Sequence, residues 1–319
     1  MTDVPVFDTD EEYERALTTP GWWEALVFEA LSIAGLPRPA SVRSGLVGTY
    51  PTYVTDTGLV VKIYGDRYAG PESHLVETEA YASLADAGLP VPSVVATGEL
   101  ASGRRWPWPF LVTTVVAGVP WGQVASKMTR AARVRTAGEL GVFLRRLHDL
   151  PLRGRIALTS SWDRFESLLA RRRRDAPSDH FRWNHLPPIL AAQVDAWLPS
   201  VRELIDESAP PVFVHGDLHA DHVFVDPATG ALLGVIDFTD ASAGDRRYDL
   251  PAIQCSVFRG YRPLLAALLE AYGATFDPRE LLAFALLHDF DMFEVPAALD
   301  PGLGGVRTLD ALATRLFRV

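Results

Sequence analysis

The sequence predicts an α+β fold in two lobes: a small lobe built on an antiparallel sheet, followed by a larger and mostly helical lobe. Residues 41–64 hold three β-rich runs separated by turn signals, which is the pattern of an antiparallel sheet. From residue 129 onward, apolar side chains instead recur at helical spacing. The sequence shows no internal repeat and no tract of low complexity, so we place a single boundary, between lobes at 1–116 and 117–319.

In the first lobe, helices are predicted where apolar residues recur at helical spacing before a glycine, here Gly35 and Gly88. Strands are predicted where β-branched and aromatic residues run between turn signals such as the Asp-Thr-Gly at 56–58. In chain order the predicted elements are a helix at 21–34, strands at 41–47, 49–55 and 59–64, a helix at 73–87 and a strand at 110–116.

The second lobe is predicted from the same two signals. Long stretches of helical periodicity dominate it, and three short strands follow a proline-rich segment, the last two joined by the turn residues at 227–230. The predicted elements are helices at 129–150 and 162–174 and strands at 212–214, 222–226 and 232–236.

The charge balance limits the class of partner. With 30 Lys+Arg against 40 Asp+Glu, the net charge is -10, which repels nucleic acid and anionic membrane surfaces. Cationic small molecules are favoured, although many proteins are acidic for solubility alone. The basic run at 171–174 lies on a predicted helix, and we interpret it as a solvated helix face rather than a nucleic-acid site.

Cysteine usage and hydropathy indicate the compartment. Cys255 is the only cysteine, so an intrachain disulfide is excluded, which fits a reducing environment. The first residues are acidic and lack the basic and apolar regions of a signal peptide, and no apolar run is long enough to cross a bilayer. We expect a soluble, cytoplasmic protein, and the sequence does not indicate its oligomeric state.

The strongest chemical signal is the segment 213–226, which reads Phe-Val-His-Gly-Asp-Leu-His-Ala-Asp-His-Val-Phe-Val-Asp, followed by Ile-Asp-Phe at 236–238. Two separated carboxylates, Asp217 and Asp237, then follow two predicted strands. Phosphoryl transfer needs an acceptor hydroxyl that is held in line and cations that neutralise the developing charge. We expect Asp217 to orient and deprotonate the acceptor and Asp237 to hold a metal. His-Gly-Asp alone would be only a turn, but the second Asp at this distance favours function.

These motifs resemble the aminoglycoside phosphotransferase family, a branch of the protein-kinase-like fold, over nearly the whole chain. The resemblance implies ATP or GTP as phosphoryl donor and Mg²⁺ as the metal. It places Lys62, in the run Val-Val-Lys-Ile, at the α- and β-phosphates. It also implies a glutamate partner for that lysine on the following helix. We choose Glu79 over Glu77, because the family pattern uses the second acidic position and the two point about 200° apart on a helix.

Further nucleotide contacts are implied by the same resemblance. The strand and linker at 110–118 imply that backbone groups of Thr114 and Val116 meet the nucleobase. Ser44, which opens a Ser-Gly-Leu-Val-Gly run, belongs to a candidate phosphate-covering loop, although two glycines are equally typical of an ordinary hairpin. Three other residues shared with recurring family segments are expected to be architectural rather than catalytic: His148, Asp245 and Asp249.

Within the family, the most specific resemblance is to hygromycin B phosphotransferases that modify the 7''-hydroxyl. It rests on segments at 70–73, 106–110, 236–240 and 280–294. A cationic antibiotic requires carboxylates to bind its amines. The candidates are one residue close after the metal-binding aspartate and three in a late segment predicted to be helical: Asp240, Asp289, Asp291 and Glu294.

One position departs from the family pattern, because His222 stands where the family usually has Asn. An imidazole nitrogen suits magnesium less well than an amide oxygen does, and it favours manganese. Either His222 ligates a second metal ion, or it only packs beside the loop or hydrogen-bonds a backbone carbonyl. The alternatives for function are a kinase of another small hydroxylated metabolite, such as a choline-like compound, a sugar or a macrolide, and an inactive nucleotide-binding protein.

Overall fold

The computed structural model describes residues 4–101, 108–152 and 157–319. The chain divides into two compact units, Met1–Ala117 and Gly118–Val319, which are described separately below.

The first unit is built on a five-stranded antiparallel sheet with the strand order β1-β2-β3-β5-β4. Its strands have the β-branched and aromatic residues that the sequence analysis used, and the predicted strands 41–47, 49–55, 59–64 and 110–116 all lie in this sheet. The elements are α1 (Asp10–Thr18), α2 (Glu24–Ile33), β1 (Val42–Ser44), β2 (Thr52–Thr55), β3 (Leu59–Ile63), α3 (Gly70–Asp86), β4 (Val94–Leu100) and β5 (Trp108–Thr114).

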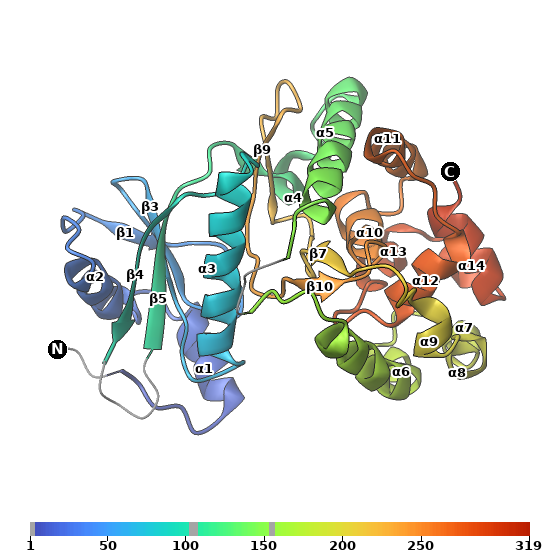
Figure 1. The fold of residues 1–319 in the computed structure, drawn as a ribbon, viewed down its shortest axis with the longest axis horizontal. Coiled ribbons are helices and arrows are strands. Elements are labelled where there is room, and N and C mark those ends of the chain that lie inside the picture. Colours follow the sequence, from blue (N-terminus) through green and yellow to red (C-terminus); the bar gives the residue numbers. More distant parts are fainter. Residues whose placement is uncertain (1–3, 102–107, 153–156) are drawn as a thin grey trace. The chain divides into compact units, whose positions relative to one another are not determined.

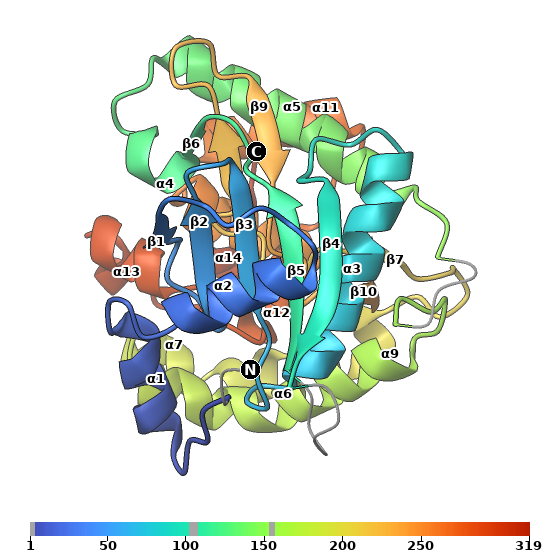
Figure 2. The ribbon, with the colours of Figure 1, turned by 90° about the vertical axis from the view of Figure 1, so that its left-hand side faces the viewer.

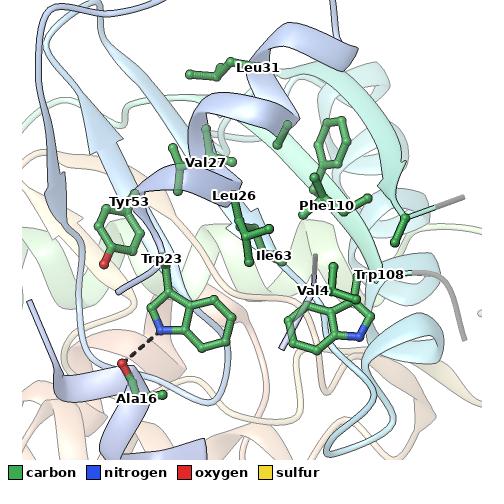
Figure 3. Packing of buried hydrophobic residues seen from close by; sticks show 14 of the residues in the cluster. Val4, Ala16, Trp23, Leu26, Val27, Leu31, Tyr53, Ile63, Trp108 and Phe110 are labelled. Atoms are coloured by element: carbon green, nitrogen blue, oxygen red, sulfur yellow. Dashed lines mark hydrogen bonds between the residues drawn. The ribbon is translucent and has the colours of Figure 1, made fainter. Parts of the chain in front are cut away.

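Two helices cover the sheet of this unit on opposite faces. Figure 1 and Figure 2 show α2 on one face and α3 on the other. Under α2, the buried indole of Trp23 packs against Trp108 of β5 with ring centroids 5.9 Å apart, and it donates a hydrogen bond to the carbonyl of Ala16 in α1 at 3.0 Å (Figure 3). The short helix α1 was not predicted; its buried residues, Tyr13 and Ala16, lie in a mostly charged stretch.

The second unit is mostly helical and holds two small sheets, one of β6, β8 and β9 and one of β7 and β10. Its elements up to the last strand are β6 (Val119–Pro120), α4 (Trp121–Val124), α5 (Arg130–His148), α6 (Asp163–Trp183), α7 (Pro188–Ala191), α8 (Val194–Trp197), α9 (Val201–Leu204), β7 (Val212–Val214), β8 (Val223–Val225), β9 (Leu232–Val235) and β10 (Ser242–Gly244). The remaining elements are α10 (Asp249–Ala252), a π-helical turn (Ile253–Val257), α11 (Arg262–Tyr272), α12 (Pro278–Leu286), α13 (Glu294–Leu299), a 3-10 turn (Leu303–Gly305) and α14 (Leu309–Phe317).

Close helix packing fixes the helical part of this unit. Figure 1 shows α5 and α11 side by side, and a Cβ atom on Gly141 would lie 2.2 Å from the carbonyl oxygen of Leu268. No larger residue fits there without separating the two helices. Among the described residues, none of the helices combines the length and the apolar character needed to cross a membrane.

The basic run at 171–174 lies on α6, which continues nine residues past the predicted end at 174. Each of its four arginines forms an ion pair with an aspartate. Arg174 is exposed as expected, but Arg172 is buried and bonds Asp179 at 2.6 Å. The run is therefore partly structural rather than wholly a solvated face.

Candidate active site

The loop after β7, residues 215–222, carries the His-Gly-Asp motif and is called the catalytic loop below. A single buried carboxylate holds its first two residues, because the backbone amides of His215 and Gly216 both donate to Asp249 at 3.0 Å. His148 of α5 also bonds Asp249, at 3.2 Å, and its other ring nitrogen lies 2.8 Å from the hydroxyl of Tyr272. His148 and Asp249 thus anchor this loop through hydrogen bonds, as the sequence predicted for Asp249.

Gly216 is required by the backbone at this point. Its φ is +87°, and a Cβ atom would lie only 2.3 Å from the carbonyl oxygen of Asp240. The catalytic loop therefore touches the segment after β9, in which Asp237 itself has a φ of +65°. A non-glycine residue in that region is strained, and such strain is concentrated at functional sites.

Asp217 follows Gly216 and is surrounded by other carboxylates. Burial raises the pKa of Asp217 well above its usual range, and the negative charges of Asp240, Asp237 and Asp249 raise it further. A carboxylate destabilised in this way binds a proton or a cation more readily than an ordinary aspartate does. This is the property that a general base needs.

Asp237 and Asp240 are joined by a shared neighbour. The hydroxyl of Thr239 donates to Oδ1 of Asp237 at 2.8 Å and also lies 3.2 Å from Oδ2 of Asp240. Their spacing in the sequence predicts that the two carboxylates lie near one another, and the structure brings them to the same turn. Asp240 is exposed at the surface of this unit, whereas Asp237 is half-buried.

His222 ends the catalytic loop, and one of its ring nitrogens faces Asp217 while the other faces Asp237. Nδ1 donates to the carbonyl oxygen of Asp217 at 2.7 Å, while Nε2 lies 3.5 Å from Oδ2 of Asp237. Burial lowers the pKa of His222 to about 3 against the opposing effect of Asp237, so the ring is neutral at pH 7. The two roles considered for His222 are thus compatible, since the carbonyl bond leaves Nε2 directed at Asp237.

These donor groups fit a divalent cation. Asp237 offers the carboxylate oxygen that Mg²⁺ prefers, and Nε2 of His222 adds a nitrogen donor, which is better suited to Mn²⁺ or Zn²⁺. Asp217, His219 and His222 also place one possible ligand atom each within 4.8 Å of the other two. His219 was not among the predicted site residues.

In the first unit, Lys62 of β3 forms its ion pair with Glu77 of α3 at 3.0 Å. This corrects the choice of Glu79. Glu77 is buried and also accepts a hydrogen bond from the hydroxyl of Tyr64, whereas Glu79 is half-buried and lies two positions along the helix, on a different side. The inward direction of one carboxylate, and not the family spacing, selects the partner of Lys62.

The segment that carries Asp289, Asp291 and Glu294 was predicted to be helical. This prediction is wrong for Asp289 and Asp291, which lie in a loop. α12 ends at Leu286, and Asp289 and Asp291 lie before Glu294 begins α13. Phe293 donates its amide to Asp291, in a side-chain-to-backbone turn that competes with helix formation.

The charges of these acids are already partly compensated. Arg171 holds Asp289 through two contacts of 2.8 and 3.0 Å, and His185 bonds Asp291. Glu294 is exposed at the start of its helix.

Comparison with known proteins identifies the family. The model of the phosphotransferase enzyme family, named APH, matches residues 48–284. The chain belongs to this family. An aminoglycoside 3'-phosphotransferase from Streptomyces fradiae is 30% identical over 208 residues, which cover 63% of this chain and 73% of that protein. A lysine-specific demethylase, JMJ21, from Arabidopsis thaliana is 28% identical over 222 residues, but the match covers 58% of this chain and only 23% of the plant protein.

Solved structures of phosphotransferases have the same fold. The GDP complex of aminoglycoside 2'-phosphotransferase-IIIa aligns with a TM-score of 0.63 at 18% identity, covering 92% of this chain and 97% of that chain. Aminoglycoside phosphotransferase APH(3'')-Id from Streptomyces rimosus, with ADP and streptomycin, aligns with a TM-score of 0.62 at 18% identity, covering 83% and 97%. The predicted α+β fold and the prediction of a phosphotransferase are confirmed.

The other residues that the family resemblance assigns to the nucleotide lie at the ends of strands in the first unit. Ser44 is the exposed last residue of β1, and Thr114 is the last residue of β5. The amide of Thr114 donates to Ser93 at 3.0 Å, so that N–H already has a partner, whereas Val116 lies beyond the strand. The roles of these residues remain predictions.

Two aromatic residues beside Lys62 were missed from the sequence. Tyr64 bonds Glu77, and the rings of Tyr50 and Tyr64 lie 5.7 and 5.6 Å from the ammonium group of Lys62. Tyr64 directly follows the strand that carries Lys62, which is the one signal that could have indicated it.

Proposed function

We propose that this protein transfers the γ-phosphoryl group of a nucleoside triphosphate to a hydroxyl group of an aminoglycoside or aminocyclitol antibiotic, with hygromycin B as the first substrate to test. The observation that carries the proposal is Asp217, a partly buried carboxylate on a loop fixed by Asp249 and surrounded by further acids. Family membership and the Streptomyces fradiae relative support the reaction class. Hygromycin B itself is supported by the sequence segments named above.

In this proposal Asp217 accepts a hydrogen bond from the acceptor hydroxyl and takes its proton as the oxygen bonds to phosphorus. Its raised pKa strengthens it as a base, and the anchored backbone of Gly216 keeps it in place. Lys62, held by Glu77, binds the α- and β-phosphates. Thr114, Val116 and the loop after Ser44 are proposed to contact the rest of the nucleotide.

Asp237 is the proposed carboxylate ligand of Mg²⁺, with Mn²⁺ as an alternative ion and Nε2 of His222 as a second ligand. When bound, the ion neutralises charge on the phosphates. Asp240 is the first candidate for binding a cationic amine, because it is exposed and close to Asp237. Asp289 and Asp291 are further candidates, although Arg171 and His185 already bond them. Glu294 is a third candidate, and it is exposed.

A substrate panel tests the proposal. Consumption of ATP and of GTP is measured with hygromycin B, kanamycin, streptomycin, a macrolide and choline, each with Mg²⁺ or Mn²⁺, and the phosphorylated product is identified by mass spectrometry. Asp217→Asn is the matched control for contaminating kinases. Turnover with hygromycin B alone supports the finer proposal, and turnover only with choline or a macrolide replaces it. Nucleotide binding without turnover on any acceptor would contradict an enzymatic role.

A further inference from the structure

We propose that Asp217, His219 and His222 form a binding site for a transition-metal cation such as Zn²⁺ or Co²⁺, and that this ion inhibits the enzyme by occupying Asp217. The three possible ligand atoms all lie within 4.8 Å of one another. The set shares His222 with the proposed magnesium site, which is centred on Asp237, but it adds Asp217 and His219. The metal site stands on geometry alone, whereas the inhibition rests on the proposed role of Asp217.

The ring of His222 is oriented so that one of its nitrogens can bind a metal ion. Its Nδ1 must carry the proton, because that atom bonds the carbonyl oxygen of Asp217 at 2.7 Å and a carbonyl can only accept. Nε2 of the neutral ring then carries a lone pair, and this nitrogen lies 3.5 Å from a carboxylate oxygen of Asp237. Two acceptors at this distance repel one another, and a divalent cation beside them makes the contact favourable. In metal-binding histidines, one ring nitrogen usually donates a hydrogen bond to the backbone or a carboxylate, and this bond orients the other nitrogen toward the metal.

The position of His219 also suits a metal ion bound to Asp217. Its Nε2 lies 3.7 Å from Oδ2 of Asp217, and its ring lies over that of His222 with centroids 3.6 Å apart. Two ligands of a tetrahedral zinc ion with bonds of 2.0–2.2 Å lie about 3.4 Å apart. The observed spacing of Asp217 and His219 therefore requires a shift of only a few tenths of an ångström.

Coordination through Nε2 of His219 requires one rearrangement. Nδ1 of this ring now accepts the amide of Asp221 at 3.3 Å, which places the proton on Nε2. Metal binding moves the proton to Nδ1 and breaks that contact, a long hydrogen bond in a half-exposed part of the loop. The change costs little compared with a metal–nitrogen bond.

The ligand types select the class of metal. Two imidazoles and one carboxylate are donors typical of zinc, cobalt and related ions, with a further position for water, while magnesium prefers oxygen donors and octahedral geometry. The carboxylates of Asp237 and Asp240 are close enough for their negative charges to be felt at Asp217, and this negative charge attracts a cation. A metal on the Asp217 carboxylate prevents it from receiving the acceptor proton, so inhibition follows from the geometry of the site.

The test measures metal binding directly on the nucleotide-free full chain. Co²⁺ is titrated while its visible absorption is recorded, and Zn²⁺ or Mg²⁺ is then added as competitor. The variants are His219→Gln and His222→Asn, with His74→Gln in the other unit as the matched control, and circular dichroism checks that each is folded. His219 is half-exposed, so its variant is informative even if His222→Asn does not fold.

We expect the wild type and His74→Gln to bind one Co²⁺ that Zn²⁺ displaces and millimolar Mg²⁺ does not. Each site variant should bind Co²⁺ at least tenfold more weakly, and Zn²⁺ that inhibits the wild type should inhibit His219→Gln less. Equal Co²⁺ affinity in wild type and His219→Gln, or displacement by Mg²⁺ as readily as by Zn²⁺, would overturn the site. Co²⁺ binding as expected in a protein that phosphorylates no antibiotic would contradict the proposed function and leave the metal site standing.

Discussion

The two units differ in how the charges of their candidate site residues are balanced. In the first unit, the ammonium group of Lys62 lies 3.0 Å from the carboxylate of Glu77, which a tyrosine hydroxyl also bonds, so opposite charges are paired. In the second unit, burial raises the pKa of Asp217, and the charges of the surrounding Asp240, Asp237 and Asp249 raise it further. In the first unit, the positive charge of Lys62 is therefore paired with a carboxylate of the protein itself.

The difference teaches what each unit requires from outside. A matched lysine–glutamate pair is pre-organised and offers a positive group of fixed direction to an anion. A group of acids with excess negative charge is stabilised only when cations reach it, either as metal ions or as a basic substrate. Substitutions in each unit test one half of this contrast.

The largest effect is expected at the centre of the acidic group. Asp217→Asn keeps the shape of the side chain but removes the base, so turnover should fall by roughly 10²–10⁴-fold while nucleotide affinity stays near that of wild type. Steady-state kinetics and nucleotide titration measure the two quantities. A variant that keeps more than about a tenth of the wild-type rate would remove Asp217 from the chemistry.

The balanced pair gives a smaller effect with an internal control. A charged hydrogen bond contributes about 1.5–3 kcal/mol, so Glu77→Gln should lower kcat/KM for the nucleotide roughly 10- to 100-fold. Glu79→Gln is the matched control on the same helix and should change kcat/KM much less. If the Glu79 variant lost more activity than the Glu77 variant, the family spacing would identify the working glutamate and the contact seen here would not.

Acidification should destabilise the second unit more than the first. Burial lowers the pKa of His288 to about 4, which keeps this ring neutral in the folded protein. Since the unfolded ring has its pKa near 6.5, the unfolded state binds more protons as pH falls below 6.5, and this contribution to stability is progressively lost toward pH 4. Between pH 7 and 5 the loss is about 2 kcal/mol, measurable by urea unfolding.

His288→Asn is the variant for this prediction, because its amide oxygen can replace Nδ1 as acceptor for the Phe290 amide. It should flatten the pH dependence of stability between pH 7 and 5. His74→Asn is the control in the first unit, where burial also lowers the pKa of the histidine. Equal flattening by both variants would contradict a greater acid sensitivity of the second unit.

The smallest effect is expected where acids are exposed. Asp240→Asn should raise KM for a cationic antibiotic about two- to fivefold with little change in kcat, since exposed ion pairs contribute up to about 1 kcal/mol. Asp289→Asn should change KM less, because Arg171 already neutralises that carboxylate. Added salt should also raise KM, as charges are screened over about 8 Å at physiological ionic strength. A KM independent of salt and of both substitutions would favour a neutral acceptor.

Much of the fold was predictable because its signals are local. The strands at 59–63 and 212–214 are short runs of β-branched and aromatic residues, and the helix at 130–148 has a capping threonine and regular apolar spacing. The short helices at 188–204 and the strand at 242–244 were missed. They are only three or four residues long, and tertiary packing rather than propensity stabilises them.

The site was predictable where a motif fixes the backbone and unpredictable where side-chain direction decides. His-Gly-Asp requires a glycine at 216, so the place of Asp217 followed from the sequence. The choice between Glu77 and Glu79 depends on which face of α3 meets the sheet, and spacing alone does not determine that. The loop around Asp289 is not helical because side chains accept its backbone amides: Tyr248 accepts the amide of Asp289, and Asp291 accepts the amide of Phe293.

The carboxylate of Asp249 has a consequence for hydrogen exchange. The amides of His215 and Gly216 lie in a loop, yet both donate to this fully buried side chain, which also bonds the core residue His148. Such protons are released only when the surrounding helices open together. The two amides should therefore exchange with deuterium as slowly as those in the middle of α5, although neither belongs to a regular element, and the loop that carries Asp217 should open no sooner than the helical unit as a whole.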